Sequence, residues 1–162
     1  MKKHTKFALL GCSRISSKHI EAIDTLSNRC DLTDICDINS DALAKVKNKT
    51  GANAFTDYEE MLGKSTADCV IITTPNGLHS SHAIQAAKSG FDVITEKPMA
   101  TNIEDAKKMI EVCSSLDRRL FVIKQVRFSK SIKMIREALS EGRFGKVYLV
   151  NLNLFWTRPQ EF

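Results

Sequence analysis

The chain has 162 residues, which suits one domain of ordinary size with a core of several buried strands. Hydrophobic residues make up 43% of it and charged residues 27%, as is usual for a soluble globular protein. The net charge of +5 is modest, the basic residues are spread along the chain and no nucleic-acid module is visible, so nucleic acid is not an expected partner.

The cysteines and the N-terminus bear on the cellular compartment. The five cysteines include no CxxC pair, and Cys36 and Cys69 lie in apolar strand-like runs, where a free thiol behaves as a small hydrophobe. The apolar run at residues 7–10 is shorter than a secretory signal needs, and no run is long enough to cross a membrane. We therefore expect a protein of the reducing cytoplasm with no membrane partner.

Strand-like and helical patterns alternate along most of the chain. Apolar runs predict strands at residues 6–10, 32–36, 52–55, 68–73, 91–95 and 120–124. Helical spacing predicts helices at residues 17–27, 41–50, 58–62, 78–89 and 102–116. Gly51 should close the second helix, and Thr101 or Asn102 should cap the last. Strict alternation of this kind predicts an α/β fold with a parallel sheet joined by right-handed crossovers.

The pattern changes near residues 125–130, where we expect a domain boundary. Residues 1–125 would form the α/β domain, and residues 126–162 a separate part with a helix at 131–141 and one long strand at 147–156. Alternate side chains of that strand are apolar, and no other strand of the chain is left to pair with it. We expect either self-association through this strand, and hence a homo-oligomer, or disorder of the strand.

The first predicted strand runs into a turn that lies where a dinucleotide site belongs. The fingerprint there is G-x-G-x-x-G, and the turn Gly11-Cys12-Ser13-Arg14-Ile15-Ser16 keeps only the first glycine. Serine is small enough for the backbone to approach a pyrophosphate, and its hydroxyl can donate to a phosphate oxygen. The helix N-terminus that follows favours an anion. An ordinary strand-to-helix turn is the alternative.

Asp37 strengthens the dinucleotide interpretation. It ends the second strand about 20 residues beyond the turn, the spacing at which an acidic side chain meets the adenosine ribose hydroxyls. Its carboxylate would repel the extra phosphate of NADP, so the sequence favours NAD over NADP. A solvated turn aspartate is the alternative.

Two further loops end predicted strands and should meet the first turn at one crevice. Glu96-Lys97-Pro98 follows the fifth strand, where Lys97 could carry charge or a proton to a substrate and Glu96 could orient it or tune its pKa. The loop with Asn76 and His79 follows the fourth strand, and His79 either carries a proton, caps the helix or bonds the backbone. A solvated lysine is the alternative for Lys97. No carboxylates or cysteines have metal-ligand spacing, so no metal site is expected.

Together these residues resemble the Gfo/Idh/MocA family of NAD(P)-dependent oxidoreductases along the whole chain. The resemblance rests on Gly11, Arg14, Ile15, Asp37, Thr74-Pro75-Asn76 with His79, Glu96-Lys97-Pro98, Gln125 with Arg127 and Phe128, and Trp156-Thr157-Arg158. It implies a Rossmann-type doubly wound sheet. The end of the chain is similar to the branch of UDP-N-acetylhexosamine and UDP-N-acetylhexosaminuronate 3-dehydrogenases of lipopolysaccharide O-antigen synthesis, which implies a nucleotide-sugar or sugar substrate.

The resemblance also implies a role for each of these segments. The turn that holds Gly11, Ser13, Arg14 and Ile15 would bind the pyrophosphate, and Asp37 the adenosine ribose. Lys97 would lie beside the reacting carbinol, aimed there by a cis Lys97–Pro98 peptide, with Glu96 near the nicotinamide ribose. The nicotinamide side would be lined by Thr74, Pro75, Asn76 and His79, while Gln125 would face the crevice and Trp156 and Arg158 would close over the cofactor.

Members of the family continue into a second α/β domain, whose aspartate and histidine lie close to the substrate. We expect residues 126–162 to be the truncated start of that substrate and oligomerisation domain, and the chain alone to bind NAD weakly and turn over little or nothing. The alternative from another class is a non-catalytic module that dimerises through its C-terminal strand. An NADP-dependent imine or biliverdin-type reductase is a third interpretation, against which Asp37 argues.

Overall fold

The computed structural model describes residues 4–155 and residue 157. The chain divides into two compact units, Met1–Ile123 and Lys124–Phe162. No helix in the described part of the chain combines the length and the apolar character that crossing a membrane requires.

One parallel sheet forms the centre of the first unit. Within the described residues it has six strands: β1 (Thr5–Leu10), β2 (Cys30–Cys36), β3 (Asn53–Phe55), β4 (Cys69–Ile72), β5 (Asp92–Thr95) and β6 (Leu120–Val122). Their order is β3-β2-β1-β4-β5-β6, and every neighbouring pair is parallel. This is the Rossmann order, in which the direction of winding reverses between β1 and β4.

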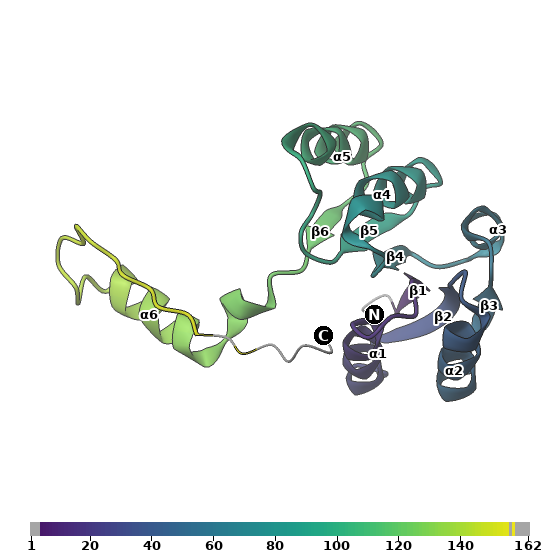
Figure 1. Cartoon of the computed structure of the whole chain (residues 1–162), viewed down its shortest axis with the longest axis horizontal. Coiled ribbons are helices and arrows are strands. Elements are labelled where there is room, and N and C mark those ends of the chain that lie inside the picture. The colour runs from purple at the N-terminus through teal and green to yellow at the C-terminus, as the bar shows by residue number, and fades with distance from the viewer. Residues whose placement is uncertain (1–3, 156, 158–162) are drawn as a thin grey trace. The chain divides into compact units, whose positions relative to one another are not determined.

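Helices cover both faces of this sheet. They are α1 (Ser16–Thr25), α2 (Ser40–Thr50), α3 (Tyr58–Lys64), α4 (His79–Lys88) and α5 (Ile103–Ser115), with a short 3₁₀ turn, η1 (Asn76–Leu78), before α4. Figure 1 shows α1 and α2 on one face and α4 and α5 on the other. The sequence predicted this alternation and most element bounds to within two residues, because the apolar periodicity is strong.

The core consists of two layers because the side chains of each strand alternate between the faces. Leu9 and Ile71 pack with Ile20 of α1 in one layer. Leu10 and Ile72 pack with Met109 of α5 in the other. The central strands β1 and β4 are therefore covered on both sides, which explains why β4 reads as an unbroken apolar run.

The predicted helix ends are confirmed. Gly51 follows α2 with φ of 72°, the left-handed conformation that favours glycine at a helix C-terminus. Asn102 caps α5, since its side chain accepts a hydrogen bond from the backbone N–H of Asp105 at 2.7 Å.

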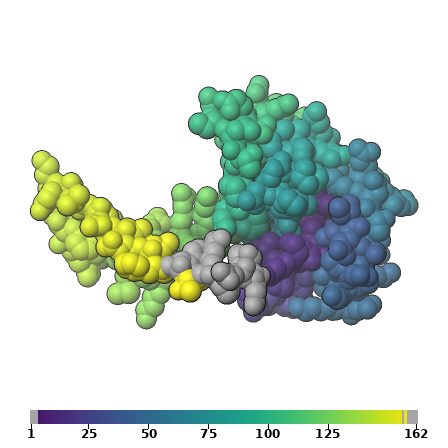
Figure 2. All heavy atoms as spheres, viewed as in Figure 1, coloured from purple at the N-terminus to yellow at the C-terminus, as the bar shows by residue number. Residues whose placement is uncertain are grey.

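The second unit holds a 3₁₀ turn, η2 (Gln125–Phe128), and one helix, α6 (Lys130–Ser140), within its described residues. The chain turns at Gly142 and Gly145, whose φ values are 69° and 58°. The segment 146–155 then runs beside α6 (Figure 2). The apolar side chains of α6 are largely exposed, among them Ile135 at 47% and Leu139 at 49%.

The prediction of one long strand at residues 147–156 is wrong over 147–155, which have no regular secondary structure; position 156 lies outside the described residues. A strand is stabilised by hydrogen bonds to a neighbouring strand, and no described residue pairs with this segment. Its side chains are exposed, with Tyr148 at 92% and Leu152 at 86%. The alternating pattern is compatible with a strand, but no neighbouring strand among the described residues pairs with this segment.

Candidate functional site

Strand register brings four predicted site segments to one edge of the sheet. Leu10 of β1 pairs with Cys36 of β2 and with Ile72 of β4. Ile72 in turn pairs with Thr95 of β5. The residues that follow these positions, namely Gly11, Asp37, Thr73 and Glu96, therefore line up at the carboxyl ends of adjacent strands. The predicted convergence of these loops is confirmed, on both sides of the point where the strand order reverses.

Gly11 occupies a position that only glycine fits. Its φ is +96°, and a Cβ atom there would lie 2.9 Å from the carbonyl carbon of Thr73 and 3.0 Å from the backbone nitrogen of Thr74. Its N–H donates to the carbonyl of Cys36 at 2.8 Å. The single glycine kept from the fingerprint thus sets how closely the first turn approaches the end of β4.

The two serines that replace the other glycines bond within the protein. Ser13 Oγ donates to the carbonyl of Thr73 at 3.1 Å, and Ser16 Oγ donates to the carbonyl of Ser13 at 2.6 Å. These hydroxyls had been expected to be available for phosphate. They instead fasten the turn to β4, because carbonyl oxygens of the tight turn lie within reach.

The start of α1 is open. Its N-terminal flanking residue is Ile15, and no side chain caps the helix. Carbonyls of the turn accept from two of the first N–H groups, Ser16 to Ser13 and Lys18 to Ile15, each at 3.0 Å. The positive end of the helix dipole remains at this start and favours an anion. Arg14 precedes Ile15 with an exposed side chain and adds positive charge. The predicted pyrophosphate turn thus retains the chemistry to bind an anion.

The Asp37 carboxylate is held against this turn. Oδ2 accepts from the N–H of Cys12 at 2.6 Å and Oδ1 from the N–H of Asn39 at 2.8 Å. Burial and the charge of Asp37 raise the pKa of the Cys12 thiol to about 11, so that this thiol is neutral at pH 7. The carboxylate is ordered by backbone donors, which pre-orients it to accept hydroxyl groups.

A cavity of about 230 Å³ opens beside Asp37. Most of its lining is apolar, as a purine or another flat ring requires. Ile38, Tyr58, Leu78 and His82 belong to it and were missed in the sequence, since nothing in their spacing links them. The lining residues are Leu10, Gly11, Ser13, Cys36, Asp37, Ile38, Tyr58, Thr73, Thr74, Pro75, Leu78 and His82.

Two side chains of this lining support each other. Tyr58 donates its hydroxyl to the carbonyl of His82 at 3.0 Å, and the two rings meet edge to face with centroids 5.2 Å apart. His82 Nδ1 lies 3.0 Å from the hydroxyl of Thr74. Burial, together with the neighbouring His79, lowers the pKa of His82, so its ring is neutral at pH 7.

His79 is buried, with 1% of its surface exposed, and both of its ring nitrogens face backbone carbonyls. Nδ1 lies 2.7 Å from the oxygen of Pro98 and Nε2 lies 2.8 Å from the oxygen of Thr74. The ring therefore joins the loop after β4 to the loop after β5. Of the roles considered for His79, bonding the backbone fits this geometry better than carrying a proton.

Glu96 and Lys97 lie at the end of β5 with different exposures. Glu96 is buried, and His19 Nε2 from α1 lies 2.9 Å from its Oε1. The Lys97 side chain is exposed, and its ammonium group has no partner among the described residues. The Lys97–Pro98 peptide is cis, as expected. His19 was not predicted as a site residue.

Of the predicted site residues, Asn76, Gln125, Trp156 and Arg158 remain. Asn76 is exposed in η1, between Pro75 and α4, at the same edge as the cavity. Gln125 is exposed in η2 of the second unit, so its place beside a cofactor stays a prediction. Trp156 and Arg158 lie outside the described residues. The described residues hold no group of His, Cys, Asp or Glu that could bind a metal ion.

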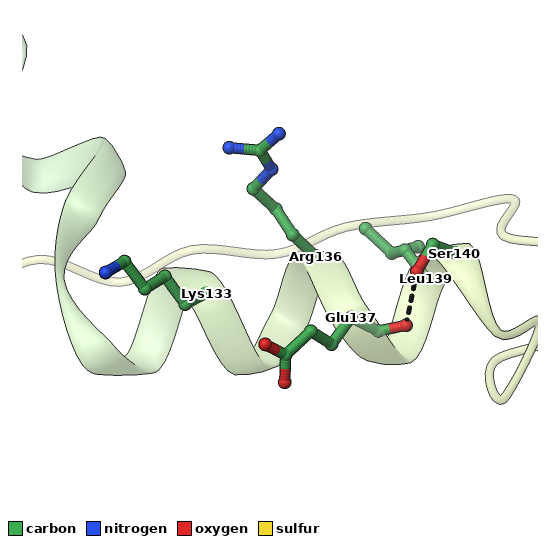
Figure 3. Close-up of a pocket in the computed structure, with 5 residues that line it drawn as sticks. All are labelled: Lys133, Arg136, Glu137, Leu139 and Ser140. Carbon is green, nitrogen blue, oxygen red and sulfur yellow. Dashed lines mark hydrogen bonds between the residues drawn. The ribbon is translucent and has the colours of Figure 1, made fainter.

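The second unit has a larger hollow, of about 600 Å³, on the surface of α6. Lys133, Arg136 and Glu137 line it with Leu139 and Ser140. Figure 3 shows that the three charged side chains point in different directions, and the hydrogen bond drawn runs from Ser140 Oγ to the carbonyl of Glu137 at 2.8 Å. The groups do not converge, so this hollow is a helix surface rather than a built site.

Known proteins share this arrangement. A family model described as an oxidoreductase family with an NAD-binding Rossmann fold, Gfo/Idh/MocA, matches residues 5–124. The WlbA dehydrogenase of Bordetella pertussis, solved with NADH and UDP-GlcNAcA, is 43% identical with a TM-score of 0.96, and the match covers 99% of this chain and 46% of that one. The Chromobacterium violaceum WlbA, solved with the same two molecules, is also 43% identical, covers the same shares and has a TM-score of 0.95.

Curated relatives agree with this match. The myo-inositol 2-dehydrogenase of Thermotoga maritima is 29% identical over 148 residues, which are 91% of this chain and 44% of the relative. The chain thus spans less than half the length of the relatives it matches. The predicted fold class, family and NAD cofactor class are confirmed. This chain belongs to the Gfo/Idh/MocA family of oxidoreductases, and its first unit is the family's NAD-binding Rossmann fold.

Proposed function

We propose that this chain is the cofactor-binding part of an NAD-dependent dehydrogenase that oxidises a carbinol of a nucleotide sugar. The observation that carries the proposal is the ordered Asp37 carboxylate at the mouth of an apolar cavity, on the same sheet edge as Glu96 and Lys97. A dinucleotide laid along this edge would reach from Asp37 to Lys97, across the point where the strand order reverses.

The residues of the first turn and of β2 would hold the adenosine half. Asp37 would accept hydrogen bonds from the ribose hydroxyls, and its charge would disfavour the 2′-phosphate of NADP. The open start of α1 would hold the pyrophosphate with Arg14 nearby, while the carbonyl-bonded Ser13 and Ser16 keep the turn in shape.

The loops after β4 and β5 would serve the reacting end. Bound NAD would supply the hydride acceptor. Lys97 would bring its amine to the substrate hydroxyl and help to remove or stabilise its proton, and Glu96 would lie near the nicotinamide ribose. The nicotinamide side would be lined by Thr74, Pro75, Asn76 and His79, with Gln125, Trp156 and Arg158 closing the site as the family resemblance implies.

The substrate class is proposed from the relatives. Two WlbA structures that are 43% identical contain UDP-GlcNAcA, which supports a nucleotide sugar and a role in polysaccharide or lipopolysaccharide synthesis. Residues 126–162 would begin the domain that binds this substrate and assembles a homo-oligomer. The free, buried cysteines suit a protein of the reducing cytoplasm.

Calorimetric titration with NAD and, in parallel, with NADP tests the proposal. We expect NAD to bind more tightly than NADP. Replacing Asp37 with serine should weaken NAD binding about tenfold or more, the effect of losing hydrogen bonds to a charged group, and should weaken NADP binding much less. Asp41→Ser, one turn away on the exposed surface of α2, is the matched control. Equal losses for both cofactors in a folded Asp37→Ser variant would refute the assignment.

A non-catalytic interaction module is the second candidate. The exposed apolar side chains at 147–155 favour it, because neighbouring exposed apolar side chains favour contact with a partner. The two candidates differ in a simple measurement: absence of binding to either cofactor, together with a dimer by light scattering, would support the interaction module and exclude the first proposal for this chain.

A further inference from the structure

The contact between His19 and Glu96 joins two elements that the proposed site uses for different purposes. His19 lies in the first turn of α1, whose start would hold the pyrophosphate, and Glu96 lies 77 positions later at the end of β5. The side chains are 13% and 8% exposed. A pair this well buried differs from a surface ion pair, which solvent screens and which contributes little.

A buried carboxylate needs compensation for both of its oxygens. Oε1 of Glu96 has His19 Nε2 at 2.9 Å. Oε2 accepts from the backbone N–H of Lys97 at 3.2 Å. The same carboxyl group therefore bonds α1 on one side and, on the other, the residue whose amine is proposed to act on the substrate.

The loop is also fixed at its other end. His79 Nδ1 lies 2.7 Å from the carbonyl oxygen of Pro98, the residue after Lys97. The loop is thus held on one side by His19 of α1, through the Glu96 side chain, and on the other by His79 of α4, which faces the Pro98 carbonyl. Only the Lys97 side chain between them lacks a partner among the described residues.

We propose that His19 is a positioning residue: through Glu96 it sets the place of Lys97 relative to the pyrophosphate turn. The inference rests on the proposed function, because Lys97 is the group that is positioned. The position of His19 in the sequence does not suggest this role. Its hydrogen bond is to Glu96, and it acts on Lys97 only through that side chain.

Two variants separate positioning from simple stability. His19→Gln keeps an N–H donor near the place of Nε2, whereas His19→Leu fills similar space without a donor. The first measurement is the acylation rate of the Lys97 amine in the full chain, by mass spectrometry, relative to the exposed Lys107 and Lys108 of α5 in the same sample. The second is the calorimetric affinity for NAD.

The expected result is a change of about twofold or more in the relative Lys97 rate in His19→Leu, as for coupling through contacting residues. His19→Gln should restore the wild-type rate. NAD binding should weaken about threefold to tenfold in His19→Leu, within the loss expected when one hydrogen bond of a charged group is removed. In Glu96→Leu, which removes the carboxyl group, the further change to His19→Leu should have little effect, because both act through one contact.

An unchanged Lys97 rate in a folded His19→Leu variant would overturn the proposal, and so would failure of His19→Gln to restore the rate. Additive effects of the His19 and Glu96 changes would also overturn it. If the wild-type chain does not bind NAD, the proposed function fails while the Lys97 rate, measured without cofactor, still decides the role of His19.

Discussion

The helices of the first unit begin in two different ways. α2, α3 and α5 are each closed by a side chain that accepts from the first backbone N–H groups, namely Asn39, Asp57 and Asn102. α1 and α4 have no such side chain. The two open helices are those that follow β1 and β4, the neighbouring strands between which the order of the sheet reverses.

The presence or absence of a side-chain cap distinguishes helix starts that add stability from those that face the proposed binding site. A side-chain cap satisfies N–H groups within the protein and stabilises the helix by about 1 kcal/mol. Without a side-chain cap, the first N–H groups of α1 and α4 bond instead to backbone carbonyls, as Ser16 does to Ser13 and His79 to Asn76. The positive end of each helix dipole is left for a ligand or for water. The two helices at the proposed cofactor edge therefore start without the stabilisation of a side-chain cap, and the loops there are held in other ways, by Gly11, by serine hydroxyls and by His79.

The largest expected effect on the free energy of unfolding comes from removing the His79 ring at the start of α4. His79→Ala should lower the free energy of unfolding by about 3–4 kcal/mol, because it leaves a cavity and removes the buried ring that bonds the backbone between two loops. Lys88→Ala, on the exposed surface of the same helix, should change it by less than about 0.5 kcal/mol. Urea unfolding measures both. A loss below about 1 kcal/mol for His79→Ala would contradict the bridging role given to this ring.

The next effect tests the turn before α1. Gly11→Ala should cost about 2–3 kcal/mol and weaken NAD binding, because its Cβ meets the backbone of Thr73 and Thr74 at a positive φ. The matched control is Gly63→Ala in α3, where no atom lies within 4 Å of a new Cβ and φ is ordinary. Gly63→Ala should be neutral or stabilise by about 0.5–1 kcal/mol. Similar results for the two variants would show that the close approach to β4 does not matter.

A smaller effect is expected at a closed helix. Asn102→Ala should lower the free energy of unfolding by about 1 kcal/mol and leave NAD affinity unchanged, because it removes the cap of α5 and the bond from Asn102 Nδ2 to the Asp105 carboxylate, both away from the proposed site. Asn102→Ser keeps an oxygen acceptor and should recover most of the loss. A clear fall in NAD affinity in Asn102→Ala would break the distinction between closed helices and open ones.

The smallest effect is in the pH dependence. The pKa of His82 is lowered by burial and by His79, so the unfolded chain takes up a proton at this ring more readily than the folded chain. Stability from this group is therefore full above the ordinary histidine pKa of about 6.5 and is lost as the pH falls below it, by at most about 1.4 kcal/mol per pH unit. Urea unfolding between pH 7.5 and 5.5 should show a shallower slope for His82→Asn than for the wild type. Equal slopes would contradict the lowered pKa.

Most of the fold could be predicted because it follows from periodicity. The unbroken apolar run of β4 and the spacing of Ile20 and Ile23 on α1 reflect burial that the sequence records locally. Gly11 and Asp37 could be found because a known spacing links them. Both of these signals lie within short windows of the chain.

The rest depends on contacts between distant side chains. His19 contacts Glu96, 77 positions later in the sequence, and Tyr58 of α3 contacts His82 of α4. No repeating pattern in the sequence marks either pair. The strand predicted at 147–156 failed for a related reason, since an alternating pattern states which face is apolar but not whether a neighbouring strand exists. Those parts required coordinates.

The free cysteines of the core offer a way to follow its opening. Cys36 and Cys113 lie in the layer under α4 and α5, whereas Cys12 and Cys30 lie in the layer under α1 and α2. Burial raises the pKa of Cys36 to about 12 and that of Cys12 to about 11. Neither thiol therefore reacts readily while its core layer remains packed. Pulsed alkylation with peptide mapping would therefore time the exposure of each face of the sheet separately, using only reporters that the natural sequence already carries.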